Sequence, residues 1–76
     1  MEGHHSAASK ISGVLSGREL ECLGLLADGM NYEQIAKRLR ISESTVAMHI
    51  TNTRRKLNAA SREQAIAIAL RTGLMK

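Results

Sequence analysis

The sequence predicts an all-α fold of four helices in one small domain. Leu, Ile, Ala and Met supply the hydrophobic content, proline is absent and Tyr32 is the only aromatic residue, a composition that favours helices over strands. Helix-start signals recur along the chain, and each is followed by apolar residues at helical spacing. We expect helices at about residues 16–28, 31–39, 43–57 and 61–71.

The first two helices each begin with a capping box, in which the N-cap side chain and the side chain three residues later bond to each other's backbone amides. Ser16 and Glu19 form the first box, and Gly29 ends that helix because glycine readily adopts the left-handed conformation. Asn31 and Gln34 form the second box in the same way. Both boxes precede an apolar stripe, which fixes where each helix starts.

The third and fourth helices carry similar signals. Ser42 caps the third, and Asn58 is a tolerable left-handed stop after it. Ser61 and Gln64 form another capping box for the fourth helix, which Gly73 ends. The spacing of these signals gives four short helices joined by short connections.

The connection between the second and third helices is the most informative. Only residues 40–42 separate them, and a three-residue turn makes two short helices cross steeply, as in a helix-turn-helix. Ile41 in this turn can point into the core and lock the angle. A plain small helical bundle with one short loop is the alternative.

Length and composition exclude several classes of protein. A chain of 76 residues buries only about 60% of its unfolded surface, which leaves no room for a deep substrate cavity. No pair of titratable groups is spaced for catalysis, so we expect no enzyme. Cys22 is the only cysteine, and no Cys/His cluster has metal-ligand spacing, so neither a metal nor a cofactor is expected. No apolar run approaches the ~20 residues of a membrane span, and we expect a cytoplasmic localisation.

The positive charge is concentrated in one segment. The formal net charge is +4 at pH 7. Residues 37–56 hold six basic residues and one acidic residue, a local net of +5, whereas the rest holds five basic and six acidic residues, a net of −1. This asymmetry is typical of a protein that binds a polyanion, although a solvated basic face gives the same count.

The third helix has two different faces. Projected at 100° per residue, its apolar stripe consists of Val46, Ile50, Thr53 and Leu57. The other side offers small polar groups in the middle and cations toward the end, a pattern that suits the DNA major groove, which admits one helix. We expect the base-reading residues to be Ala47, Met48, Thr51 and Asn52.

Each of these side chains fits a contact in the groove. Asn52 can donate to and accept from adenine, and Ala47 and Met48 can lie against thymine methyl groups. The cations Arg54, Arg55 and Lys56 suit phosphates, which supply affinity without sequence information. The alternative for these three is a favourable interaction with the dipole at the end of their own helix.

The stretches "LSGRELECLGLLADG", "EQIAKRLRISESTVAMHI" and "RRKLNAASREQAIAIAL" together resemble the LuxR/FixJ-type (GerE-like) helix-turn-helix domain of bacterial transcription regulators. The resemblance implies that 31–39 is the scaffold helix, that 43–57 is the recognition helix and that 61–71 contributes to a dimer. It covers the domain that we place at 15–76, after a flexible N-terminal arm or linker at 1–14.

The resemblance also implies contacts to the DNA backbone, and we expect them at Tyr32, Ser42, Ser44, Thr45, Arg54, Arg55 and Lys56. Two positions depart from the family pattern. Ala47 stands where members often carry Lys or Arg, and Glu33 stands where a cation would meet phosphate, so Tyr32 is left to supply a phosphate hydrogen bond. We expect the dimer interface at Ala65, Ile66, Ala69 and Leu70, the alternative being that this alanine-rich helix packs only on its own core.

These features predict a sequence-specific DNA-binding output domain of a bacterial transcription regulator. It would bind double-stranded DNA as a homodimer on a two-fold symmetric site, with RNA polymerase as a further partner. Within the family, "HITNTRRKLNAASREQAIAIALRTGL" looks most like the members that sense acyl-homoserine lactones, the signals of quorum sensing. The chain is expected to be an excised output domain or a stand-alone small regulator. The alternative function is a protein-interaction adaptor that docks an acidic partner through its basic helix.

Overall fold

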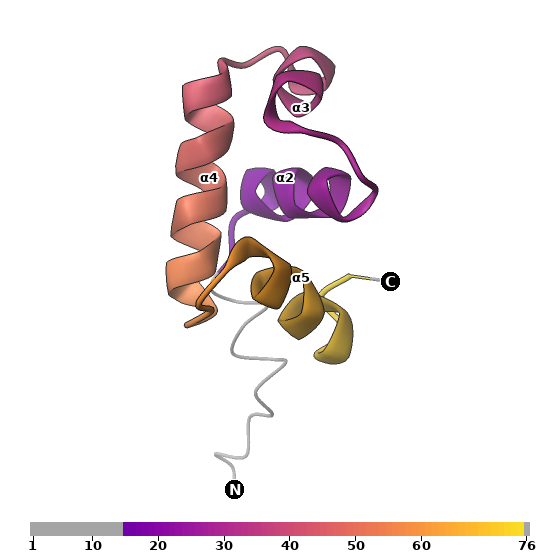
Figure 1. Cartoon of the computed structure of the whole chain (residues 1–76), viewed down its shortest axis with the longest axis vertical. Coiled ribbons are helices and arrows are strands. Elements are labelled where there is room, and N and C mark those ends of the chain that lie inside the picture. The colour runs from indigo at the N-terminus through magenta and orange to yellow at the C-terminus, as the bar shows by residue number, and fades with distance from the viewer. Residues whose placement is uncertain (1–14, 76) are drawn as a thin grey trace, which may run out of the picture.

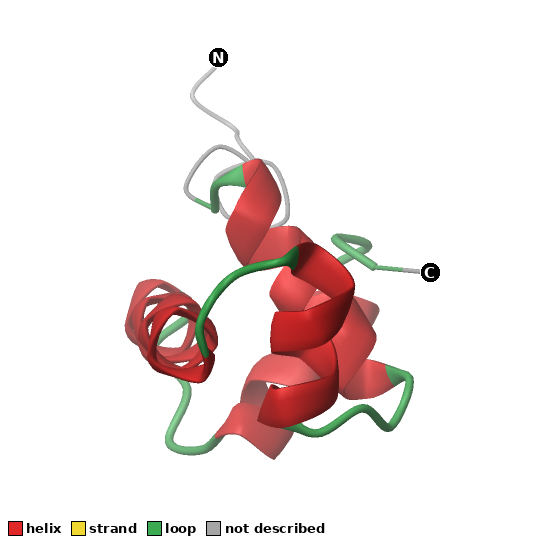
Figure 2. Ribbon diagram, turned by 90° about the horizontal axis from the view of Figure 1, so that it is seen from above, coloured by secondary structure: helices red, strands yellow, loops and turns green. Residues whose placement is uncertain are grey.

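The computed structural model describes residues 15–75, which form four helices around one core (Figures 1 and 2). The helices are α2 (Gly17–Ala27), α3 (Tyr32–Leu39), α4 (Glu43–Lys56) and α5 (Arg62–Arg71). Because the described residues contain no strand, the predicted all-α fold is confirmed. The arm predicted at 1–14 lies outside the described residues. Over residues 15–75, none of the helices is long and apolar enough to cross a membrane.

The capping signals place the helices as predicted, because the expected and observed bounds differ by at most one residue. Ser16 Oγ accepts the Glu19 N–H at 3.1 Å, and Glu19 Oε1 accepts the Ser16 N–H at 2.9 Å. Asn31 and Gln34 make the same reciprocal pair at 2.8 and 2.9 Å. These bonds satisfy amides that have no partner within the helix, which is why the starts could be read locally.

The capping box predicted at Ser61 is only half present. Ser61 Oγ accepts the Gln64 N–H at 3.0 Å, as expected. The Gln64 side chain, however, accepts from the Ala60 N–H and not from the Ser61 N–H. Ser61 is also more extended than the other caps, with φ of −146° against −76° at Ser16, and this backbone presents the preceding amide to Gln64.

The predicted three-residue turn between α3 and α4 is confirmed, and the two helices meet at a steep angle (Figure 1). Arg40 in this turn adopts the left-handed conformation with φ of 59°, and the Ile41 N–H donates to the Ala36 carbonyl at 3.0 Å. Glycine is the usual residue in such a turn because a Cβ disfavours positive φ. The predicted left-handed stops at Gly29, Asn58 and Gly73 all have positive φ.

The core lies where α4 runs against α2 and α3, while α5 covers α4 and α2 from one end. Leu23, Ile35 and Val46 are fully buried there. The predicted inner stripe of α4 is also confirmed, since Val46, Ile50, Thr53 and Leu57 are all buried. The one polar member of the stripe is satisfied, because Thr53 Oγ1 donates to the His49 carbonyl at 2.7 Å. One side of α4 is thus fixed in the core and the other faces outward.

Candidate nucleic-acid interface

The outward side of α4 carries the four expected base readers. Met48 lies at its centre with 51% of its surface exposed. Thr51 and Asn52 flank it within about one-sixth of a helical turn, given 100° per residue, and both are partly exposed. Ala47 lies at the edge of this face and is also partly exposed. The structure therefore leaves all four side chains at the surface, and their contact with bases stays a prediction.

Hydroxyl groups gather at the N-terminus of α4. Ser42 Oγ accepts the Thr45 N–H at 3.1 Å and lies 2.8 Å from Thr45 Oγ1 and 3.0 Å from Ser44 Oγ. Ser42 and Ser44 are exposed and Thr45 is partly exposed. Three of the residues that we expect to contact the DNA backbone are thus brought together. The partial positive charge of a helix N-terminus makes this end of α4 suitable for an anionic oxygen.

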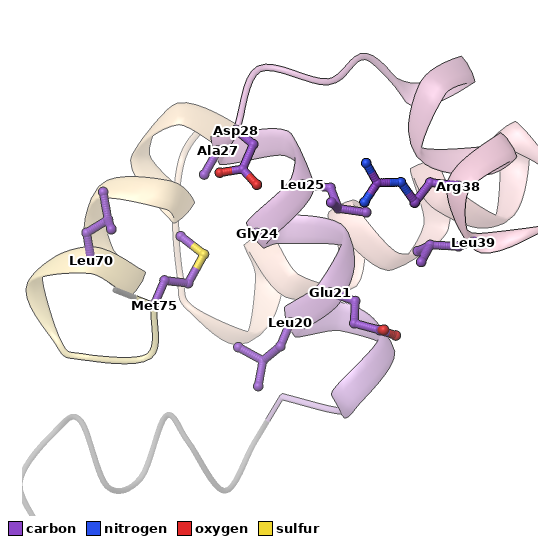
Figure 3. Close-up of a pocket in the computed structure, with 10 residues that line it drawn as sticks. All are labelled: Leu20, Glu21, Gly24, Leu25, Ala27, Asp28, Arg38, Leu39, Leu70 and Met75. Atoms are coloured by element: carbon purple, nitrogen blue, oxygen red, sulfur yellow. The ribbon is translucent and has the colours of Figure 1, made fainter.

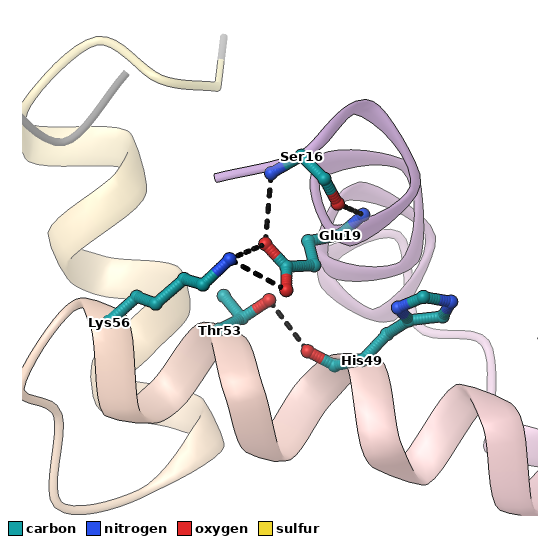
Figure 4. A network of polar contacts seen from close by, with 5 residues as sticks. All are labelled: Ser16, Glu19, His49, Thr53 and Lys56. Atoms are coloured by element: carbon teal, nitrogen blue, oxygen red, sulfur yellow. Dashed lines mark hydrogen bonds and ion pairs between the residues drawn. The ribbon is translucent and has the colours of Figure 1, made fainter. Parts of the chain in front are cut away.

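The basic residues at the other end of α4 differ from one another. Arg55 is exposed and Arg54 is partly exposed, and neither forms an ion pair with an acidic residue in the described range. Lys56 instead points to α2, where its Nζ lies 2.9 and 3.1 Å from the two carboxylate oxygens of Glu19 (Figure 4). The sequence indicates only a capping role for Glu19, since no local signal links two positions 37 residues apart.

The environment of Glu19 favours its ionised form. Only 4% of the residue is exposed. Burial raises the pKa of its carboxyl, but the hydrogen bonds from Ser16 and Lys56 outweigh burial and hold the pKa below its ordinary value. Glu19 is therefore a buried carboxylate that needs a cation beside it.

Tyr32 has a protein partner that the sequence did not indicate. The Arg62 guanidinium lies over its ring, 5.2 Å from the ring centroid, and joins the start of α5 to the start of α3. A cation over an aromatic face is attracted by the negative charge density of the ring. The expected phosphate contact of Tyr32 stays a prediction, but its ring has this separate role in packing.

The α5 helix divides the expected dimer residues into two groups. Ala65 and Ala69 are fully buried in the core of their own domain, so these two side chains cannot contact a second copy, contrary to the expectation. Leu70 is 49% exposed and Ile66 is partly exposed. Ala67, which the prediction left out, is exposed on the same side of the helix. The apolar arc of α5 thus serves the core with one part and faces outward with another.

An open groove of about 540 Å³ lies between α2, the end of α3 and the C-terminal residues (Figure 3). Its lining is mostly apolar and includes no residue of α4. The groove therefore lies apart from the candidate DNA-contacting face. It is open to solvent. Its lining residues are Leu20, Glu21, Gly24, Leu25, Ala27, Asp28, Arg38, Leu39, Leu70 and Met75.

The short turn, the exposed polar face of α4 and the hydroxyl groups at its start define a helix-turn-helix domain. Residues 13–69 match the family model described as "Bacterial regulatory proteins, luxR family", and the chain belongs to this family. It is 41% identical over 69 residues to the transcriptional activator protein LuxR of Aliivibrio fischeri, a match that covers 91% of this chain and 28% of LuxR. It is 51% identical over 57 residues to the nitrate/nitrite response regulator protein NarP of Escherichia coli, covering 75% of this chain and 26% of NarP.

The fold agrees with this assignment. The solved structure of the transcription factor GerE superposes with a TM-score of 0.80 at 43% identity, covering 83% of this chain and 94% of that one. The resemblance predicted from the sequence is therefore confirmed, and the chain is a DNA-binding helix-turn-helix domain of a transcription regulator. These relatives are regulators, which agrees with the expectation that the chain is not an enzyme. The chain spans about a quarter of the length of LuxR and of NarP.

Proposed function

We propose that this domain places α4 in the DNA major groove and binds a two-fold symmetric site as a dimer. The observation that carries the proposal is the division of α4 into two faces. One face is locked into the core by Val46 and Ile50, and the other presents Met48 and small polar groups to solvent. A helix anchored in this way can enter a groove without any change of fold.

The outer face supplies two kinds of contact. Thr51 and Asn52 read base edges by hydrogen bonds, while Ala47 and Met48 contact them by apolar surface. Phosphates on one side of the groove meet the hydroxyl groups of Ser42, Ser44 and Thr45, and phosphates near the other end of α4 meet Arg54 and Arg55. The contacts to base edges give sequence preference, and the contacts to phosphates give affinity and register.

The outward residues of α5 support dimerisation through this helix. Ile66, Ala67 and Leu70 form a small apolar surface on one side of the helix. A two-fold axis along this surface would pair it with itself, since the same patch then serves both copies. Two recognition helices related by such an axis would reach half-sites about one helical turn of DNA apart.

The complete protein is then a transcription regulator that acts on chromosomal DNA in the cytoplasm and works with RNA polymerase. The likeness of residues 49–74 to members that sense acyl-homoserine lactones supports quorum sensing as its response. The 35% identity over 68 residues to the HTH-type quorum sensing-dependent transcriptional regulator VjbR of Brucella ovis supports the same proposal. Since LuxR and NarP are each about four times as long as the matched region, the signal would be received outside this domain.

The test is a selection of bound sequences from a random duplex library, repeated at low and high salt. We expect a two-fold symmetric motif that survives at high salt, because base contacts do not depend on counterion release as phosphate contacts do. Binding that disappears with salt and leaves no motif would refute the proposal and favour an adaptor that docks an acidic protein.

Two variants distinguish residues that contact bases from residues that contact the DNA backbone. Asn52→Ala should relax the preference at single base pairs by about 1–3 kcal/mol each. Arg55→Met should weaken binding to all sequences and reduce the salt slope by about 0.9, the value for one phosphate contact. A uniform loss from Asn52→Ala would contradict its role as a reader.

A further inference from the structure

The last residue of the recognition helix is tied to the first turn of α2. Lys56 Nζ donates to both oxygens of Glu19, at 2.9 and 3.1 Å, and the Ser16 N–H donates to Glu19 Oε1 at 2.9 Å (Figure 4). The side chain of Glu19 is 6% exposed and that of Lys56 is 37% exposed. The ion pair thus joins two helices at the edge of the core.

Breaking this pair from the Lys56 side would leave a charge in an unfavourable place. A carboxylate removed from water is strongly destabilising unless a cation and hydrogen bonds compensate it. Within residues 15–75, Ser16 would be the one hydrogen-bonding partner left to the Glu19 carboxylate if the ammonium left. The Lys56 ammonium therefore compensates the charge of the Glu19 carboxylate and is held in the position where it stands.

Arg54 and Arg55 are not held in this way. Neither forms an ion pair with an acidic group between residues 15 and 75. Both lie on the last turn of α4 beside Lys56, at the surface. Three consecutive cations that look alike in the sequence thus differ in what they are free to contact.

We propose that Lys56 is a positioning residue for DNA recognition, whose ion pair with Glu19 sets the C-terminal end of α4 against α2, while Arg54 and Arg55 make the phosphate contacts. This inference rests on the proposed major-groove function. Because α4 carries all the base readers, a shift of its end against α2 would misplace Asn52 and Thr51 relative to the bases. Phosphate contacts by flexible arginine side chains would tolerate the same shift.

The experiment measures affinity for the selected operator and for an unrelated duplex over a series of salt concentrations, at a temperature where every variant is folded by circular dichroism. Lys56→Met should lower affinity for the operator by about ten-fold, in the range of coupling between groups in one network. Its affinity for the unrelated duplex and its salt slope should stay unchanged. The matched control, Arg55→Met, should weaken both duplexes and lower the slope by about 0.9.

A second variant keeps the test valid if Lys56→Met does not fold. In the double variant Glu19→Gln/Lys56→Met the buried charge is removed, and the oxygen of the introduced amide can still accept the Ser16 N–H. This double variant should fold, because a neutral replacement of a buried ion pair is often tolerated. Its operator affinity should stay about ten-fold below that of the parent, with an unchanged salt slope, because the ion pair that positions α4 is still absent.

Two results would overturn the inference. If Lys56→Met and the double variant both lose salt slope as Arg55→Met does, Lys56 is a phosphate contact. If Lys56→Met changes the melting temperature but neither affinity nor the preference for the operator, the pair is only structural. A parent domain that yields no operator at all would refute the proposed DNA function itself, which is a separate and distinguishable result.

Discussion

Glu19 accepts hydrogen bonds from two directions. The Ser16 N–H reaches it from its own helix, and Lys56 Nζ reaches it from the end of α4. The first bond closes a capping box and the second joins distant parts of the chain. One carboxylate therefore fixes both the start of α2 and the place of α4 beside it, and its ionisation state matters for the whole domain.

We expect acid to destabilise the domain partly through Glu19. Because the pKa of Glu19 is lower in the folded protein than its ordinary value of 4.5, its carboxylate stabilises the fold fully above that pH. This contribution is lost as the pH falls through the lower folded-state pKa. Urea unfolding on both sides of pH 4.5 measures it, and Glu19→Gln should reduce the loss on the acid side.

The control for that experiment is Glu21→Gln, which removes an exposed carboxylate from the same helix. Equal acid sensitivity in Glu19→Gln and in the parent protein would show that the buried carboxylate has no part in it.

The α4 helix has few charges on its outer face. Between Glu43 and Arg54 it carries no charged residue, and Met48 is the large exposed side chain at its centre. Arginine and lysine are the usual partners of guanine, whereas apolar groups contact the methyl group of thymine. With Ala47 beside Met48, the middle of this helix is suited to A·T pairs with the thymine methyl facing it.

We therefore expect deoxyuridine to weaken binding when it replaces a thymine in the centre of each half-site. Loss of one buried methyl costs about 0.8 kcal/mol, which corresponds to roughly four-fold in affinity. Titration of the parent protein and of Met48→Ala with both duplexes gives a double-mutant cycle. The replacement should have little effect on Met48→Ala, whereas equal sensitivity in both proteins would exclude Met48 as the contact. A thymine outside the selected motif serves as the control.

The domain as a whole is arranged so that α5 closes one end of the core and still has a free side (Figure 1). Ala65 and Ala69 are small enough to bring α5 close to the core, and both are fully buried. Leu70 and Ala67 face outward instead. A single short helix can thus complete the monomer and offer a surface to a second copy.

Leu70→Glu should prevent dimerisation, because a two-fold axis near Leu70 would bring two new charges together without solvent. We expect weaker binding to a duplex with two half-sites and unchanged binding to a single half-site. Analytical ultracentrifugation measures the dimerisation of the same variants in parallel. Gln64→Glu is the matched control, since it adds the same charge on α5 and keeps an oxygen for the Ala60 N–H. If both variants behave like the parent, the dimer surface lies elsewhere.

Features that depend on neighbouring residues were predictable. Each helix start was read from a polar cap such as Ser16 or Asn31, whose partner lies three residues away. The buried side of α4 followed from the spacing of Val46 and Ile50. The left-handed turn at Arg40 was not expected, because its sequence carries no glycine or asparagine to mark it.

The sequence by itself determined the four helices, the three-residue turn and which face of α4 is buried, since caps and periodicity act within one or two turns of the chain. The tertiary structure decided which of three adjacent cations is free and which alanines of α5 are buried. It also decided that Tyr32 packs under Arg62. These outcomes depend on which surfaces the helices present to one another, and burial sets the need for a partner only after the helices have packed.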